Sequence, residues 1–140
     1  MLAPAIGLQR GGYILWEAKS MPEIILIGTG SEVHIALEAG KRLEQEDIAA
    51  RVVSLPSWSL FDAQPIAYRQ SVLPPAIWAR ISIEAGTPLG WERYIGLDGV
   101  AIGLSRFGAS APGEVIYQQL GLTPERIVET ARSLLRGEEV

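Results

Sequence analysis

The residues best suited to chemistry form a turn. It follows four apolar residues, Ile24–Ile27, and precedes a segment with helical spacing of apolar residues. The turn consists of Gly28, Thr29, Gly30, Ser31 and Glu32. Backbone N–H groups at the start of a helix attract anions, so this turn is a candidate site for a small anion or a phosphate. The alternative is that two glycines only let the chain turn tightly from a strand into a helix.

The fingerprint of a dinucleotide-binding site is incomplete in this turn. Val33 replaces its third glycine, and the segment after the next strand, 54–57, contains no acidic residue. The missing glycine normally lets the helix pack closely on the strand, and the missing acid binds the ribose. A tight turn is therefore the favoured interpretation, and anion binding is kept as a hypothesis.

Other patterns that resemble catalytic motifs each lack an essential residue. The loop 103–110 has the glycine spacing of a P-loop, but Ala109 stands where the lysine is needed. The chain has one histidine, His34, and no cysteine, which argues against a serine hydrolase, a thiol nucleophile and a Cys/His metal site. Glu84 and Asp98 could form a carboxylate pair, although structural roles are more usual for both. We therefore predict no catalytic residue and no metal ligand.

Aromatic residues gather in the segments between the predicted strands. These are Trp58, Trp91, Tyr94 and Phe107. Core or interface packing is the usual role of such side chains. Arg80 and Arg106 could meet an anion, but solvated or ion-paired roles are more common for arginine.

The composition narrows the class of protein. The 140 residues have a net charge of −4 and are 48% hydrophobic, which suits one domain with a core and argues against a basic nucleic-acid-binding surface. No apolar run reaches the roughly 18 residues of a membrane span, and we find no signal peptide. We expect a cytoplasmic protein without nucleic-acid or membrane partners, divided into an N-terminal arm or linker (1–11), a single domain (12–136) and a tail (137–140).

Strand and helix patterns alternate along the domain. Strands are predicted over 12–18, 24–27, 50–56, 79–86 and 100–105, and helices over 33–43, 61–72 and 91–96, from 114 and from 123. Ser31 is the expected N-cap of the first helix, and Thr123-Pro124 the expected start of the last. The turn 20–23 is too short for a crossover, so the first strand should run antiparallel to the others. The pattern predicts a three-layer α/β/α sandwich around a mostly parallel sheet of about five strands.

Several segments, taken together, resemble the C-terminal domain of the transketolase family. They are "GGYIL" (11–15), "ILIGTGSEVHIALEA" (25–39), "ARVVSLPSWSLFDAQ" (50–64), "YRQSVLP" (68–74), "RISIEAG" (80–86), "GWERYIGLDGVAIGLSRFGASAP" (90–112) and "GLTPERIV" (121–128). The resemblance covers nearly the whole chain in order, and it is more specific than any motif above.

The resemblance implies a role inside a larger enzyme. Transketolases move a two-carbon ketol unit between sugar phosphates with thiamine diphosphate and a divalent metal such as Mg²⁺, as homodimers of three-domain chains. The family's cofactor lies between the first two domains, held partly by asparagines, and this chain contains no asparagine. The resemblance therefore implies that this chain alone is inactive and binds no cofactor, with a second copy or the missing transketolase domains as its partners.

The missing domains should leave an exposed apolar face on this one. The candidate interface residues are Trp91, Tyr94, Phe107 and Ser110. Two alternatives are kept: a free-standing module that binds a phosphate-bearing metabolite at the Gly28–Ser31 turn, and an independent enzyme built on Glu84 and Asp98.

Overall fold

A computed structural model describes residues 9–84, 90–103 and 122–138. Within them, five strands form one sheet: β1 (Tyr13–Glu17), β2 (Ile24–Gly28), β3 (Ala50–Ser54), β4 (Arg80–Ile83) and β5 (Val100–Ile102). The strand order is β1-β3-β2-β4-β5, with β1 antiparallel to β3 and the other neighbours parallel. The predicted α/β class and mostly parallel five-stranded sheet are confirmed.

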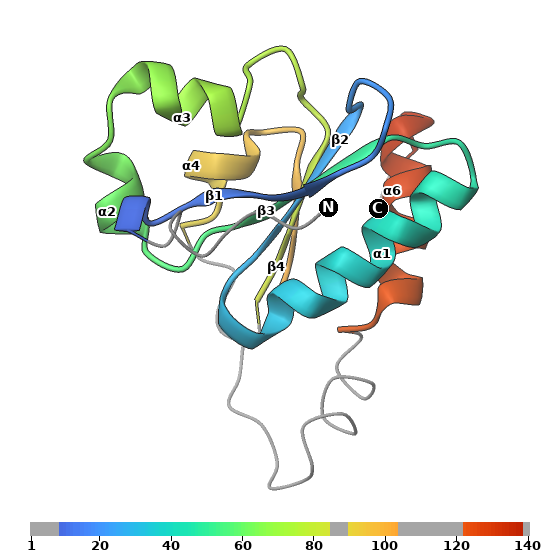
Figure 1. The fold of residues 1–140 in the computed structure, drawn as a ribbon. Helices are drawn as coiled ribbons and strands as arrows, with labels where there is room; N and C mark the ends of the chain where they lie inside the picture. The colour runs from blue at the N-terminus through green and yellow to red at the C-terminus, as the bar shows by residue number, and fades with distance from the viewer. Residues whose placement is uncertain (1–8, 85–89, 104–121, 139–140) are drawn as a thin grey trace, which may run out of the picture.

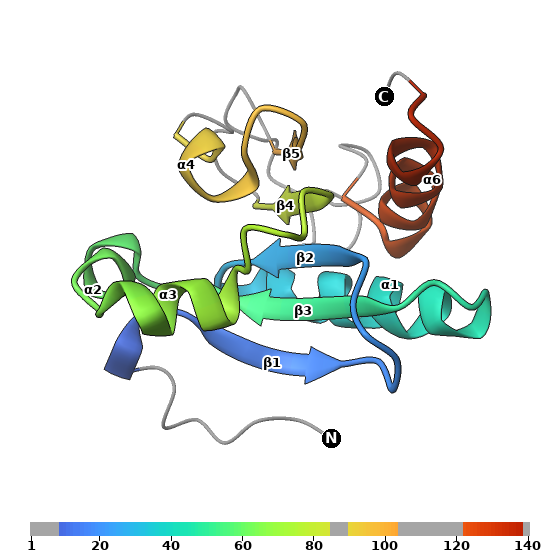
Figure 2. The ribbon, with the colours of Figure 1, turned by 90° about the horizontal axis from the view of Figure 1, so that it is seen from above.

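The helices cover both faces of this sheet (Figures 1 and 2). They are η2 (Gly30–Glu32), α1 (Val33–Gln45), α2 (Trp58–Asp62), α3 (Ile66–Val72), α4 (Glu92–Ile95) and α6 (Pro124–Leu135). Helices α1 and α6 pack together on one face, and α2, α3 and α4 lie on the other. No helix within the described ranges is long and apolar enough to cross a bilayer.

Strand β2 lies in the middle of the sheet and is buried on both faces. Its side chains alternate: Ile24 and Leu26 pack under α1, and Ile25 and Ile27 pack under the short helices of the opposite face. A continuous apolar run is typical of a parallel strand covered on both sides, which explains the lack of polar alternation in this segment.

Strand β1 lies beside β3, although the chain leads directly from β1 into β2. The connecting segment therefore passes one strand, a distance of roughly 10 Å at the usual strand spacing. It is fastened to the start of β3, because Ala18 N–H donates to Ala50 O (3.0 Å) and Glu23 N–H donates to Ala49 O (2.9 Å). The predicted antiparallel direction of β1 is confirmed.

The start of α1 differs from the prediction. Thr29 and Glu32 occupy the cap positions of η2 and α1, and neither caps its helix with a side-chain hydrogen bond. Ser31 lies inside the 3₁₀ turn, so its prediction as the N-cap is wrong. A short 3₁₀ turn commonly precedes an α-helix, and here it moves the first α-helical residue to Val33.

The predicted helix over 61–72 is two helices. Pro65 has an extended backbone (φ −56°, ψ 147°) and stands between α2 and α3, where its ring cannot continue a helix. Helix α2 also begins earlier than expected, because the Ser57 side chain accepts a hydrogen bond from Leu60 N–H (3.3 Å).

Among the remaining element boundaries, the predicted start of the last helix is confirmed and two strands are shorter than predicted. The start of α6 is confirmed, since the Thr123 hydroxyl accepts from Arg126 N–H at 3.2 Å and Pro124 is the first helical residue. Strands β4 and β5 are shorter than predicted. The helix expected from 114 lies outside the described residues.

Candidate functional site

The candidate anion-binding turn lies at the carboxyl end of β2. A Cβ added at Gly28 would lie 2.7 Å from the Cα of Val33, so a glycine is needed where the strand passes close to the helix. Gly30 has open space around its Cα but a φ of +53°, a backbone conformation that glycine adopts without strain. The geometry of the turn accounts for both glycines.

The hydrogen bonds of this turn also favour a structural role. Glu32 N–H, one of the expected anion donors, already donates to Thr29 O at 3.1 Å. The side chain of Glu32 is only 7% exposed, which places an acidic residue inside the turn. A nearby carboxylate disfavours a second negative charge. Anion binding by the residues from Gly28 to Glu32 stays a prediction, and these contacts support the tight-turn interpretation.

The carboxylate pair considered from the sequence does not form. Glu84 follows β4 at the carboxyl edge of the sheet, where its N–H donates to Ile102 O (3.1 Å). Asp98 precedes β5 and so lies at the opposite, amino edge. The two parallel strands separate these residues by on the order of 10 Å. The alternative of an enzyme built on this pair is therefore not supported, because Glu84 follows its strand and Asp98 precedes the parallel neighbour, and the favoured structural interpretation stands.

Glu84 instead holds an aromatic cluster in place. One of its carboxylate oxygens accepts from Trp91 Nε1 at 2.7 Å. The ring of Trp58 lies 4.9 Å from that of Trp91 and 5.1 Å from that of Tyr94, in edge-on or tilted arrangements. Such geometry is favourable for aromatic pairs. The cluster fills the space between α2, α4 and the sheet.

Two of the four candidate interface residues belong to this cluster. Trp91 is 0% exposed and Tyr94 is 4% exposed, so the chain's own core covers both rings. Phe107 and Ser110 lie outside the described residues. An interface role for these four positions stays a prediction, and the buried rings of Trp91 and Tyr94 offer a partner almost no surface.

Tyr94 has an acidic partner that the sequence did not reveal. Its hydroxyl donates to Asp62 Oδ1 at 3.0 Å, and Arg93 forms an ion pair with the same carboxylate. Burial, followed by the hydrogen bond to Asp62, raises the pKa of Tyr94 to about 12. At neutral pH this phenol is therefore a neutral donor, which suits a structural role better than a nucleophile.

Arg80 has no carboxylate partner among the residues that the structure describes. Its guanidinium donates to four main-chain carbonyls, those of Leu73, Pro74, Ile77 and Tyr94. Burial lowers the pKa of Arg80 below its ordinary value. These bonds join the ends of α3 and α4 to the start of β4, and no sequence pattern identifies them because the acceptors are backbone atoms.

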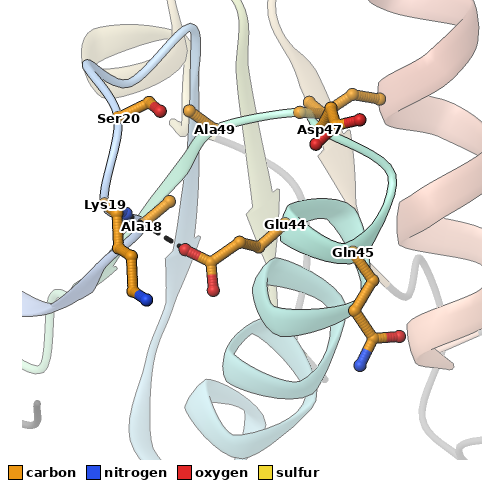
Figure 3. A pocket seen from close by; sticks show the side chains of 8 residues that line it. Ala18, Lys19, Ser20, Glu44, Gln45, Asp47 and Ala49 are labelled. Atoms are coloured by element: carbon orange, nitrogen blue, oxygen red, sulfur yellow. Dashed lines mark hydrogen bonds between the residues drawn. The ribbon is translucent and has the colours of Figure 1, made fainter.

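A separate hollow of about 440 Å³ lies where β1 ends beside the end of α1 (Figure 3). Its polar wall contains Lys19, whose backbone N–H donates to Glu44 Oε2 at 3.0 Å. Asp47 has a positive φ of 63° just after α1, which is typical of the residue that ends a helix. No group of three or more potential metal ligands occurs in the described part of the chain. We assign this hollow no chemistry.

Comparison with known proteins identifies the family. The model of the transketolase-like TK C-terminal domain matches residues 11–123. The chain belongs to this family. It is similar to the chloroplastic transketolase of Spinacia oleracea, with 50% identity over 130 residues, 91% of this chain and 18% of that protein.

Solved transketolases share the fold of this domain. The structure from Leishmania mexicana matches with a TM-score of 0.84 and 40% identity, over 96% of this chain and 19% of that one. A Pichia stipitis transketolase in complex with sedoheptulose 7-phosphate matches with a TM-score of 0.81 and 38% identity, over 94% of this chain and 19% of that one. The chain thus spans about a fifth of the length of these transketolases.

Proposed function

We propose that the chain acts as the non-catalytic C-terminal domain of a transketolase. The parent enzyme would transfer a two-carbon ketol unit between sugar phosphates. The observation that carries this proposal is the family match over most of a chain that spans about a fifth of its relatives. A relative solved with sedoheptulose 7-phosphate supports sugar phosphates as the substrate class.

The thiamine diphosphate and Mg²⁺ of the parent enzyme would be held elsewhere. Mg²⁺ prefers several oxygen ligands in octahedral geometry. The chain has no asparagine, and its described residues offer no cluster of three potential metal ligands. The described residues do not fit this cofactor, so we assign no catalytic step to them.

Contact with the rest of the parent enzyme would use an apolar rim at the amino edge of the sheet. Met21, Trp78 and Leu97 are 89%, 49% and 98% exposed. They shortly precede β2, β4 and β5, which are neighbours in the sheet, so the three side chains share one edge. Exposed apolar residues that gather on one surface are typical of an interface. This rim replaces the buried rings of Trp91 and Tyr94 as our candidate surface.

A chimeric enzyme tests the proposal. The matching part of the Spinacia oleracea enzyme is replaced by this chain, and ketol transfer and molecular mass are compared with those of the truncated enzyme and of the chain alone. We expect an active, dimeric chimera, an inactive or dissociated truncated enzyme, and no activity from the chain alone. Turnover by the chain alone, or full activity and an intact dimer without this domain, would refute the proposal.

Substitutions in the chimera separate the rim from the rest of the surface. Trp78→Asp and Leu97→Asp should disrupt assembly, because a charge in an apolar interface is costly to desolvate. Ile66→Asp is the matched control, since Ile66 is 61% exposed at the start of α3 and does not belong to the rim. Equal effects of all three substitutions would argue against the rim. The cytoplasmic compartment stays a prediction, because some relatives are chloroplastic.

A further inference from the structure

A hollow of about 300 Å³ on the outer surface of α2, α3 and α4 has an unusual charge. Three arginines and one carboxylate line it: Arg69, Arg80, Arg93 and Asp62. The chain as a whole has a net charge of −4, so this concentration of positive charge runs against the average of the protein. Like charges held close together in a partly buried site repel one another, which favours binding of an anion.

The hydrogen bonds show which positive charges are already compensated. Arg93 forms an ion pair with Asp62, and that carboxylate also accepts from the Tyr94 hydroxyl. The carboxylate that lines the hollow is therefore engaged by Arg93 and Tyr94. Arg69 and Arg80 remain as two positive charges without a carboxylate partner among the described residues.

The two uncompensated arginines also have N–H groups to offer. Arg69 uses only its Nε, which donates to Gln64 O at 3.1 Å, so its two terminal nitrogens have no protein partner within the described residues. Arg80 Nη1 donates to Tyr94 O at 2.7 Å and keeps a second N–H. Arg69 can therefore bind phosphate oxygens through two parallel hydrogen bonds, which a lysine cannot reproduce, and Arg80 can add one more.

The rest of the lining is mostly apolar, with Gln70 as a further polar residue. Phe61, Ile66, Leu73 and Tyr94 lie beside the arginines, and Ile66, which is 61% exposed, supplies most of the accessible apolar surface. Sites for small molecules commonly combine such apolar walls with a few polar groups that fix the orientation of the ligand. The hollow therefore has a charged part for an anion and an apolar part for an organic body.

We propose that this hollow binds a dianionic phosphate group, either free or as the monoester of a small metabolite, through Arg69 and Arg80. Two negative charges match the two positive charges that the protein leaves uncompensated. The site is separate from the Gly28–Glu32 turn, and it does not depend on the proposed role in a transketolase.

Titration of the 140-residue chain, followed by the NMR signals of arginine Nε–H groups, tests the proposal. Inorganic phosphate and ribose 5-phosphate are the two probes, at constant ionic strength and with chloride as the reference salt. We expect saturable shifts at Arg69 and Arg80. Tighter binding of ribose 5-phosphate would assign the apolar wall to an organic body, and equal affinity would assign the site to the phosphate group alone.

Two variants should change the phosphate affinity in opposite directions. Arg69→Gln should weaken binding about tenfold, the loss expected for one charge-assisted contact. Asp62→Asn should tighten binding, because it removes the one carboxylate that lines the hollow among the described residues. Arg126→Gln is the matched control on the exposed surface of α6 and should bind as the unmodified chain does.

Two results would overturn the proposal. One is the same response to chloride as to phosphate, and the other is unchanged phosphate affinity in Arg69→Gln. A melting curve of each variant checks its fold. If Arg69→Gln is unfolded, Arg69→Lys takes its place, with weakened binding expected because lysine keeps the charge but loses the planar fork.

Discussion

The two faces of the sheet are covered by helices of very different kinds. On one face, α1 has 13 residues and α6 has 12, and both bury a stripe of mostly aliphatic side chains. On the other face, α2, α3 and α4 have 5, 7 and 4 residues. Helices this short are not stable by themselves, so tertiary contacts must hold them in place.

The contacts that hold the short helices are few and specific. Aromatic rings fill the space beneath them, and Trp91 is anchored by Glu84. Two arginines donate to carbonyls at the end of α3: Arg51 to Ser71 and Val72, and Arg80 to Leu73. A cation near the end of a helix also interacts favourably with the helix dipole. One face thus relies on two long helices with aliphatic stripes, and the other adds aromatic and arginine contacts to a smaller apolar cluster.

The largest effect should come from the centre of the short-helix face. Trp91→Ala removes a fully buried ring and leaves Glu84 without its donor, and we expect it to lower the free energy of unfolding by about 3–5 kcal/mol. Urea unfolding followed by circular dichroism measures this change. Trp91→Phe keeps a ring and should cost less. A loss below about 1 kcal/mol for Trp91→Ala would contradict the importance of the aromatic cluster for the short-helix face.

The second largest loss of stability should come from Arg80, whose guanidinium bonds to backbone carbonyls, and not from an arginine on the exposed surface. Arg80→Gln leaves several carbonyls at helix ends without their donor, and we expect a loss of about 2–3 kcal/mol in the free energy of unfolding. Arg42 on α1 pairs with Glu38 and Glu125 on the exposed surface, so Arg42→Gln is the matched control and should leave the urea midpoint nearly unchanged. Equal losses for both variants would contradict the proposed difference between the faces.

The same contrast explains which features the sequence predicts. The amphipathic helices α1 and α6 have periodic patterns, and β2 is a short continuous apolar run between turn residues, so these three elements are predictable from the sequence. The pairing of Glu38 with Arg42 follows from their spacing of one helical turn, and the structure confirms it at 2.7 Å. The strand order does not follow from any local pattern, because β1 passes its neighbour in sequence to pair with β3.

The short-helix face is where sequence reasoning is weakest. The break between α2 and α3 depends on Pro65, which the apolar spacing of the segment obscures. The bonds of Arg80 to carbonyls and of Tyr94 to Asp62 join residues that are distant along the chain. Such contacts carry no sequence signal, so the arginine-lined hollow is visible only once the fold is known.

A pH titration tests the buried phenol on the short-helix face. The folded-state pKa of Tyr94, about 12, lies above its ordinary value of 10.0, so the folded protein holds this proton more tightly than the unfolded chain does. Stability from this group is therefore fully present below pH 10.0 and lost as the pH rises toward 12. The free energy of unfolding should fall between pH 9 and pH 11, and it should fall less in Tyr94→Phe than in the unmodified chain. The same pH dependence of the unfolding free energy in both proteins would contradict a raised pKa for Tyr94.

A smaller effect of opposite sign is expected at Ser82 in β4. Its neighbours Ile81 and Ile83 pack under α1, so by strand alternation Ser82 faces the short helices. The side chain is 1% exposed, and its hydroxyl has no hydrogen-bond partner among the described residues. Ser82→Ala should therefore raise the free energy of unfolding by about 1 kcal/mol. Destabilisation by Ser82→Ala would show that the hydroxyl has a partner in solution.

The smallest effect belongs to the exposed ion pairs that join α1 to α6. Hydrogen bonds from Arg132 and Arg42 lower the pKa values of Glu46 and Glu125 below their ordinary value of 4.5. Their contribution should be present above that pH, be lost as the pH falls through the lowered values, and be screened by salt. We expect the double variant Glu46→Gln/Glu125→Gln to melt slightly below the unmodified chain at pH 7 in low salt. The difference should disappear in high salt and shrink as the pH falls below 4.5. A decrease as large as that of Arg80→Gln would mean that the α1–α6 face also depends on a few charged contacts, since aliphatic packing is unchanged by these substitutions.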